Sequence, residues 1–454
     1  MNTEMITSDQ LRVVIGLGKT GYSCARFLVE QGHRVMVVDS RQSPPYLPQL
    51  QQDFPELPIK LGVFDSNLLK QASELIVSPG IALTEPAIAD AIAAGVPVVG
   101  DIELFARALE DTPVIAITGS NGKSTVTTLV GEMAAVAGIK VAVGGNIGRP
   151  VLELLTEKAD LYVLELSSFQ LETTYSLKPA VACILNISPD HMDRYADLSA
   201  YHKAKQRIFR GAQSVVFNRQ DALTQPLVPS SVPQVSFGLN EPDLKHFGCR
   251  QSNNTVQLSY GLDEWLDSQQ LLIKGSHNQA NVLAALAIGH QLHWSKPSML
   301  TAIKQFKGLP HRCEWVAEHN QVTFINDTKA TNVGAAKASI EGLGEQLTGK
   351  IILLAGGDGK GADFSELKPA IAKYVKCLLT FGCDGERLAA EVAGAAEQQS
   401  VTGLSEAILQ AVNYAKPGDL VLLAPACASF DMFTNFEQRG EVFKQIVMRF
   451  IDAQ

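Results

Sequence analysis

The chain has 454 residues, of which 46% are hydrophobic and 19% are charged, and it carries a formal net charge of −9. A chain of this length exceeds what one hydrophobic core organises and suggests about three domains. The acidic balance argues against a nucleic-acid-binding surface as the main function. The composition therefore indicates a globular protein whose partners are small molecules, with no nucleic acid among them.

Residues 1–10 lack the basic and then apolar layout of a secretion signal, and no apolar run approaches the length that spans a membrane. The seven cysteines are scattered and form no C-x-x-C pair. Several, such as Cys183 and Cys377, lie in apolar runs typical of strands, which favours buried free thiols over disulfides or zinc. We expect a cytoplasmic protein with no membrane partner.

The first segment of the chain alternates short apolar strands with helical stretches. A strand at 13–15 leads into the turn 16–21, GLGKTG, a helix-like run extends to Gln31, and a second strand at 34–38 ends in Asp39. Further strands are expected at 74–77 and 96–99. This order predicts a parallel sheet with right-handed crossovers. A glycine turn with an acid after the second strand is the dinucleotide-binding layout, although this fingerprint alone does not choose the ligand.

The second segment contains the most specific motif. A strand at 114–117 runs into TGSNGKS at 118–124, and a helical pattern follows from Thr125. The glycines let backbone amides converge on an anion, Lys123 reaches the terminal phosphates, and the Ser124 hydroxyl is placed to bind Mg²⁺. The common form of this loop has glycine or alanine at the position of Ile117. An ordinary strand-to-helix turn is the alternative, and a nucleotide phosphate site is favoured.

Polar residues follow the next strands of this segment, which are expected at 140–143, 161–164, 181–185 and 214–217. Asn146 follows the first of them, Glu165 the second and His191 the third. Because open α/β sheets bind ligands beyond the carboxyl ends of their strands, these side chains are candidate ligands. Glu165 beside a phosphate loop suits a second Mg²⁺ anchor, and His191 suits a further metal ligand or a general base. A solvated strand-end carboxylate is the alternative for Glu165.

Lys205 has an unusual place in the helical stretch 201–209. Tyr201, Ala204, Lys205 and Ile208 recur at positions i, i+3, i+4 and i+7, so Lys205 lies on the apolar stripe, whereas Lys203 faces away. A buried ammonium is costly unless it is paired or chemically altered. From the spacing alone we favour a lysine whose stem packs while its head reaches water. The alternative is a functional amine held dry near the Mg²⁺ sites.

The regular rhythm of strands and helices is interrupted at 221–270, where we expect an antiparallel patch, and it returns with a helix at 279–292. Strands of a third segment are expected at 322–325, 350–354, 375–379 and 420–423. The predicted fold is therefore α/β with three domains. These are an N-terminal Rossmann-like domain (1–101), a central P-loop-type ATPase domain with a mainly parallel sheet (102–308) and a C-terminal Rossmann-like domain (309–454).

Several longer motifs appear in a fixed order over essentially the whole chain: TGSNGKS, GGNIG, LELSSFQL, NISPDHMDRY, the lysine at 205, HN at 277–278 with Asn281, GLPHRCE, NDTKATN, GGDGKGADF and PACASFDMF. In these motifs the sequence resembles the Mur ligase family of cell-wall precursor enzymes. One departure is Ser120, where the family usually has threonine.

The resemblance implies a reaction in which ATP phosphorylates a substrate carboxylate and the amine of an amino acid then displaces the phosphate. It implies that Lys123 holds the β- and γ-phosphates and that two Mg²⁺ ions are bound. Ser124 and Glu165 would hold one ion, and His191 would help to hold the second. Lys205 matches the lysine that the family carbamylates with CO₂, which would make it a metal-bridging anion.

The resemblance also implies three sets of contacts. The ATP set is Gly119, Ser120, Asn121, Gly122, Lys123, Ser124, Thr125, Asn278, Asn281, Arg312, Asp327 and Lys329. The set for the UDP-linked substrate is Gly18, Lys19, Thr20, Asp39, Ser40, Arg41, Gly80, Asn146 and His191. The set for the incoming amino acid is Thr331, Lys360, Ser429 and Phe436. A place in the core is the alternative for Phe436, because a lone aromatic residue in a helix-like stretch is usually buried.

Within the family, the HRCE and GGDGKGADF motifs favour the branch that adds D-glutamate to UDP-N-acetylmuramoyl-L-alanine. We also expect a monomer. A related ligase that adds a different amino acid is the first alternative. An NAD(P)-dependent oxidoreductase based on residues 13–39 is a second alternative, but this activity would give the phosphate loop no function. A non-catalytic nucleotide-binding module is a third, but it needs no amino-acid pocket.

Overall fold

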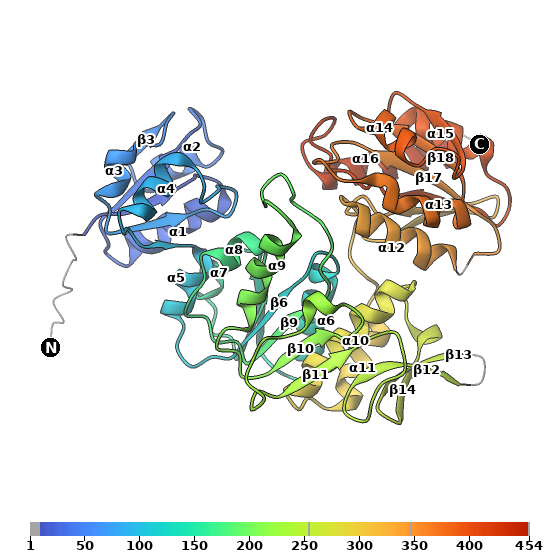
Figure 1. Ribbon diagram of the computed structural model, residues 1–454, viewed down its shortest axis with the longest axis horizontal. Coiled ribbons are helices and arrows are strands. Elements are labelled where there is room, and N and C mark those ends of the chain that lie inside the picture. The colour runs from blue at the N-terminus through green and yellow to red at the C-terminus, as the bar shows by residue number, and fades with distance from the viewer. Residues whose placement is uncertain (1–9, 253–254, 346, 453–454) are drawn as a thin grey trace.

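The computed structural model describes residues 10–252, 255–345 and 347–452, and these form three α/β units (Figure 1). The expectation that residues 1–10 carry no targeting signal falls almost entirely on residues 1–9, which lie outside the described part. None of the helices in the described ranges is both long and apolar enough to span a membrane.

The first unit is a parallel sheet of five strands in the order β3-β2-β1-β4-β5. Its elements are β1 (Arg12–Ile15), α1 (Lys19–Glu30), β2 (Val35–Asp39), α2 (Leu47–Asp53), β3 (Ile59–Leu61), α3 (Ser66–Lys70), β4 (Glu74–Val77), α4 (Pro86–Ala93) and β5 (Val98–Val99). The predicted Rossmann-like layout is confirmed. The strand β3 was not predicted, because only three residues of mixed polarity form it.

The turn between β1 and α1 is shaped by close backbone approach. Gly16 has φ +93°, and a Cβ atom built on Gly21 would lie 1.7 Å from the carbonyl oxygen of Gly16. Only a glycine at 21 therefore lets α1 start this close to the end of β1. This packing places the N-terminus of α1 over the carboxyl ends of β1 and β4.

The central unit has a parallel sheet in the order β11-β10-β9-β6-β8-β7. Its elements are α5 (Asp101–Ala108), β6 (Val114–Thr118), α6 (Lys123–Val136), β7 (Val141–Gly145), α7 (Val151–Leu154), β8 (Leu161–Glu165), α8 (Ser168–Glu172), β9 (Val181–Ile184), α9 (Leu198–Gln206), η1 (Arg207–Phe209), β10 (Val215–Asn218), η2 (Ala222–Thr224) and β11 (Gln234–Phe237). Along β6 the side chains alternate between two cores, with Ala116 in one and Ile115 and Ile117 in the other. The central strand β6 thus carries the phosphate loop at its carboxyl end.

The irregular stretch after β11 contains the expected antiparallel patch, a sheet of β12 (Phe247–Ser252), β13 (Thr255–Tyr260) and β14 (Asp263–Asp267). After η3 (Ser268–Gln270), the helices α10 (Ser276–Gln291) and α11 (Lys296–Gln305) complete the unit. Phe247 lies between this patch and α10, with its ring centroid 5.1 Å from Trp265 and 5.6 Å from His290. The contact with His290 attaches the patch to the helix α10.

The third unit has a six-stranded sheet in the order β15-β16-β20-β17-β18-β19, in which β15 alone runs antiparallel to its neighbour. Its elements are β15 (Glu314–His319), β16 (Val322–Asn326), α12 (Val333–Gly344), β17 (Ile351–Gly356), η4 (Phe364–Leu367), α13 (Lys368–Tyr374), β18 (Val375–Phe381), α14 (Gly385–Glu391), β19 (Glu397–Ser400), α15 (Leu404–Tyr414), β20 (Leu420–Leu423) and α16 (Phe436–Asp452). Both edge strands were missed by the sequence prediction, because β19 is wholly polar and β15 carries charges.

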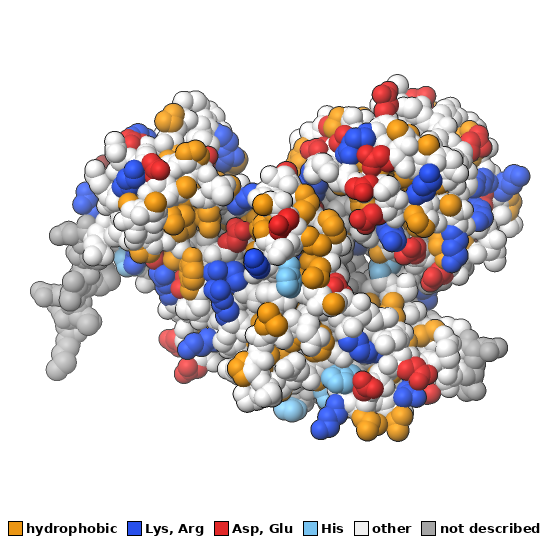
Figure 2. All heavy atoms as spheres, viewed as in Figure 1, with side chains coloured by type: hydrophobic (Ala, Val, Ile, Leu, Met, Phe, Trp, Pro, Cys, Tyr) orange, Lys and Arg blue, Asp and Glu red, His pale blue; other side chains and the backbone are white. Residues whose placement is uncertain are grey.

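The two junctions between the units differ in character. One apolar cluster extends from the first unit into the central one and includes Val14, Leu17, Phe105 and Val151. The third unit has apolar clusters of its own. Figure 2 shows the molecule hollowed above the central unit, between the first and third units. Because the first and central units share one apolar cluster, the junction between them is packed like a hydrophobic core.

The expectation of free thiols is confirmed, since every cysteine is unpaired. Five are buried, whereas Cys313 is half-buried and Cys383 is exposed.

The glycine turn gives a stability prediction. We expect Gly21→Ala to destabilise the first unit by about 2 kcal/mol or more, because its new methyl group overlaps backbone that cannot move aside. Gly18→Ala is the matched control, since no atom lies within 4 Å of its Cβ position. Scanning calorimetry of both variants measures the effect, and equal unfolding temperatures would contradict it.

Candidate active site

The phosphate loop is held in place at the start of α6. Gly122 has φ +81° and precedes the first helical residue, and a Cβ atom there would lie 2.4 Å from Oδ1 of Asn281. Lys123 Nζ donates to the carbonyl oxygens of Gly119 and Ser120, each at 2.8 Å. The loop therefore places a lysine ammonium and a helix N-terminus on the same side, as an anion site requires.

A cavity of about 260 Å³ lies beside this loop. Its lining combines residues of the central unit with residues of the third unit: Ser120, Asn121, Gly122, Lys123, Asn146, Glu165, Ser167, Ser168, Phe169, Asp190, His191, Tyr201, Lys205, Arg312, Lys329, Thr331, Asn332 and Lys360. We call it the catalytic cavity. It brings together residues that the sequence placed in separate sets for ATP, metal ions and the amino acid.

Glu165, at the end of β8, has one oxygen without a protein partner. Asn146 Nδ2 donates to Oε1 at 2.8 Å, whereas Oε2 is buried and has no hydrogen bond from any described residue. Burial opposes ionisation of this carboxyl, but Lys123 and the Ser124 hydroxyl outweigh it and hold its pKa below the ordinary value. An ionised carboxylate with a free buried oxygen fits a hard cation such as Mg²⁺.

Lys205 is buried in the helix α9, with 1% of its surface exposed. Its Nζ donates to Gly119 O at 2.9 Å and to Thr118 Oγ1 at 3.4 Å, and lies 4.6 Å from the centroid of the Tyr201 ring. The favoured interpretation, a head that reaches water, is therefore wrong. Burial and the nearby Lys123 lower the pKa of Lys205 well below its ordinary value, although the charges of Asp190 and Glu165 oppose this shift.

Asp190 and His191 follow β9 on a strained turn in which His191 has φ +59°. Asp190 accepts from Lys360 Nζ at 3.0 Å and from Asn332 Nδ2 at 3.1 Å, both in the third unit. Burial and the surrounding lysines lower the pKa of His191, although Asp190 opposes them. The histidine is therefore neutral near pH 7 and offers a lone pair to a metal ion.

The contact roles of Asp190 and Asn332 were missed at the sequence level. Asn332 Nδ2 also donates to Asn121 Oδ1, at 3.2 Å, and so connects the third unit to the phosphate loop. The motifs contained both residues, but nothing in the sequence paired residues more than 140 positions apart.

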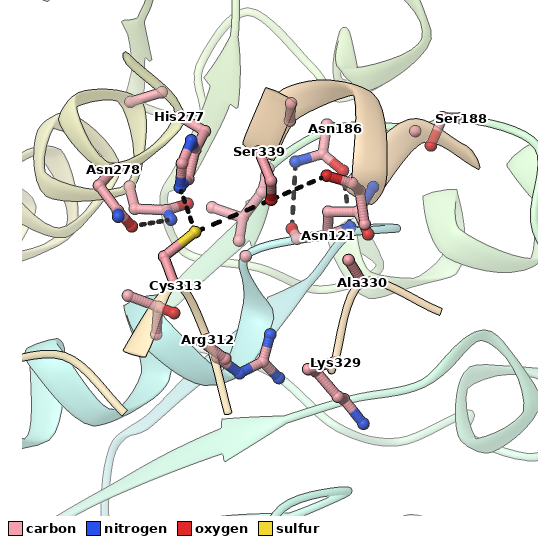
Figure 3. Close-up of a pocket in the computed structure, with 18 of the residues that line it drawn as sticks. Asn121, Asn186, Ser188, His277, Asn278, Arg312, Cys313, Lys329, Ala330 and Ser339 are labelled. Carbon is pink, nitrogen blue, oxygen red and sulfur yellow. Dashed lines mark hydrogen bonds between the residues drawn. The ribbon is translucent and has the colours of Figure 1, made fainter. Parts of the chain in front are cut away.

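A second cavity, of about 340 Å³, also borders the phosphate loop, and Asn278, Asn281 and Asp327 line it together with Thr125. Figure 3 shows Asn278 on its wall. Asn281 Nδ2 donates to Asn278 Oδ1 at 3.2 Å. These residues were predicted at the nucleotide, and we call this space the nucleotide cavity.

Two residues that the sequence analysis did not single out fix the orientation of Asp327. Ser339, on α12, donates to its Oδ2, and the backbone amide of Cys313 donates to its Oδ1 at 3.1 Å. Figure 3 shows the Cys313 sulfur between the His277 ring and the Ser339 hydroxyl, 3.6 and 3.8 Å away. A helical period could have placed Ser339 on the buried face of α12, but not against Asp327.

Arg312 and Lys329 of the third unit line the same cavity as Asn121 of the phosphate loop (Figure 3). Arg312 Nη2 donates to Ser124 Oγ at 2.6 Å across the junction. Burial, with Arg312 and Lys123 nearby, lowers the pKa of Lys329 to about 8. Lys329 Nζ lies 3.8 Å from the centroid of the Phe436 ring. The positive groups of the two units thus converge on the same loop.

A third cavity, of about 530 Å³, lies at the carboxyl ends of β1 and β4, between the first and central units. Its lining contains Gly18, Lys19, Thr20, Asp39, Ser40, Arg41, Gly80 and Asn146, which the sequence analysis assigned to the UDP-linked substrate. Asp39 accepts from the amide of Leu17 at 2.7 Å and pairs with Arg41 at 2.7 Å. We call this space the substrate cavity.

Two predicted residues of the amino-acid set line none of the three cavities. Ser429 is buried in the loop after β20, and its carbonyl caps the turn that leads to Phe433. Phe436 is half-buried beneath Lys329, so it is neither a core residue nor a wall of these cavities. Thr331 and Lys360 do line the catalytic cavity.

Models of known families match the chain in three consecutive parts. These are the Mur ligase MurD-like N-terminal domain over residues 10–100, the Mur ligase middle domain over 117–289, and the Mur ligase glutamate ligase domain over 311–427. The chain belongs to the Mur ligase family. The three-domain α/β fold expected from the sequence is the fold of this family.

Curated Mur ligases are similar along almost the full length. A UDP-N-acetylmuramoylalanine–D-glutamate ligase of Pseudomonas syringae pv. syringae is 52% identical, and one of Pseudomonas aeruginosa is 51% identical, each over 98% of this chain and 99% of the relative. One of Acinetobacter baylyi is 51% identical over 97% of this chain and 98% of the relative.

Solved structures of ligases share the fold at low identity. A pseudomurein peptide ligase of Methanothermus fervidus superimposes with a TM-score of 0.62 at 19% identity, covering 97% of this chain and 100% of that structure. The UDP-N-acetylmuramate–alanine ligase of Thermotoga maritima superimposes with a TM-score of 0.61 at 18% identity, covering 98% and 100%. The three-domain arrangement is therefore common to ligases of distant sequence.

The lowered pKa of Lys329 gives a pH prediction. Lys329 is charged below its pKa of about 8 and neutral above it, so ATP affinity should fall as pH rises through 8, by up to about tenfold at pH 9. ATP dissociation constants from titration calorimetry at pH 7 and 9 test this expectation. For Lys329→Arg, which stays charged at both pH values, the ATP dissociation constant should change less with pH. The same change in the wild type and in this variant would contradict a role of the Lys329 charge in ATP binding.

Proposed function

We propose that the protein is an ATP-dependent ligase that joins D-glutamate to UDP-N-acetylmuramoyl-L-alanine in peptidoglycan precursor synthesis, releasing ADP and phosphate. Relatives of about half identity over nearly the whole chain are named for this reaction. The observation that carries the proposal is the catalytic cavity. It lies between the substrate and nucleotide cavities, and Asn146 lines both it and the substrate cavity, whereas Arg312 and Lys329 line both it and the nucleotide cavity.

We propose three functional units with boundaries at 101/102 and 308/309. The first holds the UDP end of the substrate, the central one holds ATP and the third holds the amino acid. The sheets of the three units fall within these limits, the first family model ends at residue 100, and the third begins at 311.

The chemistry requires two anions, the γ-phosphate of ATP and the acceptor carboxylate, to come together against their mutual repulsion. A carboxylate oxygen attacks the γ-phosphorus, the bond to ADP breaks, and an acyl phosphate results. The amine of D-glutamate then attacks the acyl carbon, loses a proton and displaces phosphate. Lys123, Arg312 and Lys329 counter the negative charge that gathers in both steps.

The cavity has groups that suit two Mg²⁺ ions. Ser124 and Glu165 would hold one, with the unpartnered Glu165 oxygen as a ligand, and neutral His191 would help to hold the other. In the described residues no three His, Cys, Asp or Glu side chains form a metal site by themselves. Phosphate oxygens and a carbamate would therefore complete the ligand sets. Bound Mg²⁺ would neutralise phosphate charge and polarise the γ-phosphate.

Lys205 has the properties that carbamate formation requires. A neutral amine attacks CO₂, whereas an ammonium does not, and burial with Lys123 nearby favours the neutral form. The product would be an anion among cations, directed into the catalytic cavity that Lys205 lines.

D-glutamate has two carboxylates, which suits the cationic and hydroxyl groups of Lys360 and Thr331 on one side of the catalytic cavity. We assign Ser429 and Phe436 to this pocket by family resemblance alone. A domain movement that exposes them would be needed, because they lie outside the cavities. We further propose that the protein acts as a monomer in the cytoplasm, where its ATP and thiol-preserving conditions are found.

The experiment that tests this function measures phosphate release from ATP in the presence of UDP-N-acetylmuramoyl-L-alanine and one amino acid at a time. D-glutamate should support the highest rate, and L-glutamate, L-alanine and diamino acids should support little. Turnover with a different amino acid would assign the chain to another branch of the family. No turnover with any amino acid would refute the proposal.

Replacement of the buried lysine tests the carbamate. Lys205→Ala should lower the rate of phosphate release by about 100-fold or more, because a metal ligand is lost, and short carboxylic acids should restore part of it. Lys203→Ala, on the exposed face of the same helix, is the control and should retain its activity. Full activity of Lys205→Ala without added acid would show that the lysine binds no metal.

A further inference from the structure

One arginine at the junction of the first and central units binds both of them. Arg194 lies in the loop between β9 and α9, and its guanidinium donates to Pro79 O at 3.2 Å and to Ile81 O at 2.7 Å. Both carbonyls belong to the loop after β4 of the first unit, and they flank Gly80. The two bonds therefore fix the loop on either side of a residue that lines the substrate cavity.

The same guanidinium also contacts the catalytic cavity through an aromatic ring. Its carbon lies 4.3 Å from the centroid of Phe169, which lines that cavity. The Phe169 ring meets His191 edge-on at 4.9 Å and stacks on Tyr195 at 5.8 Å. Arg194 thus connects the loop of the first unit to the ring that packs against His191.

The loop that Arg194 holds forms a wall of the substrate cavity. All four residues from Ser78 to Ile81 line it, and Ser78 Oγ donates to Gly16 O at 3.1 Å, which attaches the loop to the glycine turn. The position of this loop therefore sets where the substrate cavity lies relative to the phosphate loop in the central unit.

We infer that Arg194 is a positioning residue for the nucleotide-sugar substrate, which it aligns with the catalytic cavity by holding residues 78–81 against the central unit. The inference rests on the proposed function, since that function supplies the substrate. A planar guanidinium suits two carbonyls and an aromatic face at once, whereas a lysine ammonium donates from a single point. Arg194 acts through the loop rather than on the reacting atoms.

The chain offers a matched control in Arg207. Its guanidinium donates to Leu171 O at 2.6 Å and to Thr174 O at 3.0 Å and lies 5.1 Å from the Tyr175 ring. Arg207 therefore makes the same kinds of contact as Arg194, but all of them lie within the central unit.

The test compares Arg194→Ala, Arg194→Lys and Arg207→Ala in the full-length protein. For Arg194→Ala we expect the KM for UDP-N-acetylmuramoyl-L-alanine to rise about tenfold, while the KM values for ATP and D-glutamate change by less than about twofold. Arg194→Lys should fall between the wild type and the alanine variant, and it serves as the test if the alanine variant does not fold. Arg207→Ala should leave the KM for the nucleotide sugar unchanged.

An equal change of all three KM values, or an equal effect of Arg194→Ala and Arg207→Ala, would overturn the inference. Calorimetric measurement of UDP-N-acetylmuramoyl-L-alanine binding without ATP distinguishes a failure of this inference from a failure of the proposed function. A wild type that binds this compound but forms no product would refute the proposed reaction. The loss of binding in the Arg194 variants would still decide the role of Arg194.

Discussion

Repulsion between like charges is the constraint on which the rest of this structure depends. Four basic side chains converge on the phosphate loop: Lys123, Lys205, Arg312 and Lys329. Lys360 lines the same cavity, and Glu165 and Asp190 are its carboxylates among the residues that the structure describes. Burial, in several cases together with neighbouring positive charge, lowers the pKa of each of the four basic groups at the phosphate loop. Such a concentration of positive charge is favourable only when anions enter, so the cavity is arranged for phosphate and carboxylate rather than for its own stability.

The chain divides this charge between two bodies. Lys123 and Lys205 belong to the central unit, whereas Arg312 and Lys329 belong to the third. The hydrogen bonds that join these units include Arg312 with Ser124 and Lys360 with Asp190, and no cluster of buried apolar side chains among the described residues spans both units. Polar contacts exchange readily with water and ligands, whereas the apolar cluster shared by the first and central units does not. The molecule therefore has one firm junction, which Arg194 reinforces, and one that separates more easily.

The sequence predicted the parts of this arrangement that follow from local patterns. The phosphate loop, the strand ends at Glu165 and His191 and the apolar stripe of α9 were readable, because short periods and glycine positions determine them. The helical period could place Lys205 on the stripe but could not show that its head lies too deep to reach water. The partners of Asp190 and Arg194 were not readable, because each lies in an element more than 100 positions away in the sequence. The polar edge strand β19 was missed since its pairing with β18, rather than its own residues, makes it a strand.

The place where the chain crosses into the third unit has a geometric consequence. The crossing lies between the end of α11 and the start of β15, and Arg312 and Cys313 lie on it. If the third unit swings about this crossing, atoms near the pivot travel little and distant atoms travel far. Arg312, which contacts Ser124 of the phosphate loop, would then keep its place through most of the swing, while Lys360 would be carried away from Asp190. Such a swing would open the side of the catalytic cavity at Lys360 while leaving the contact between Arg312 and the phosphate loop in place.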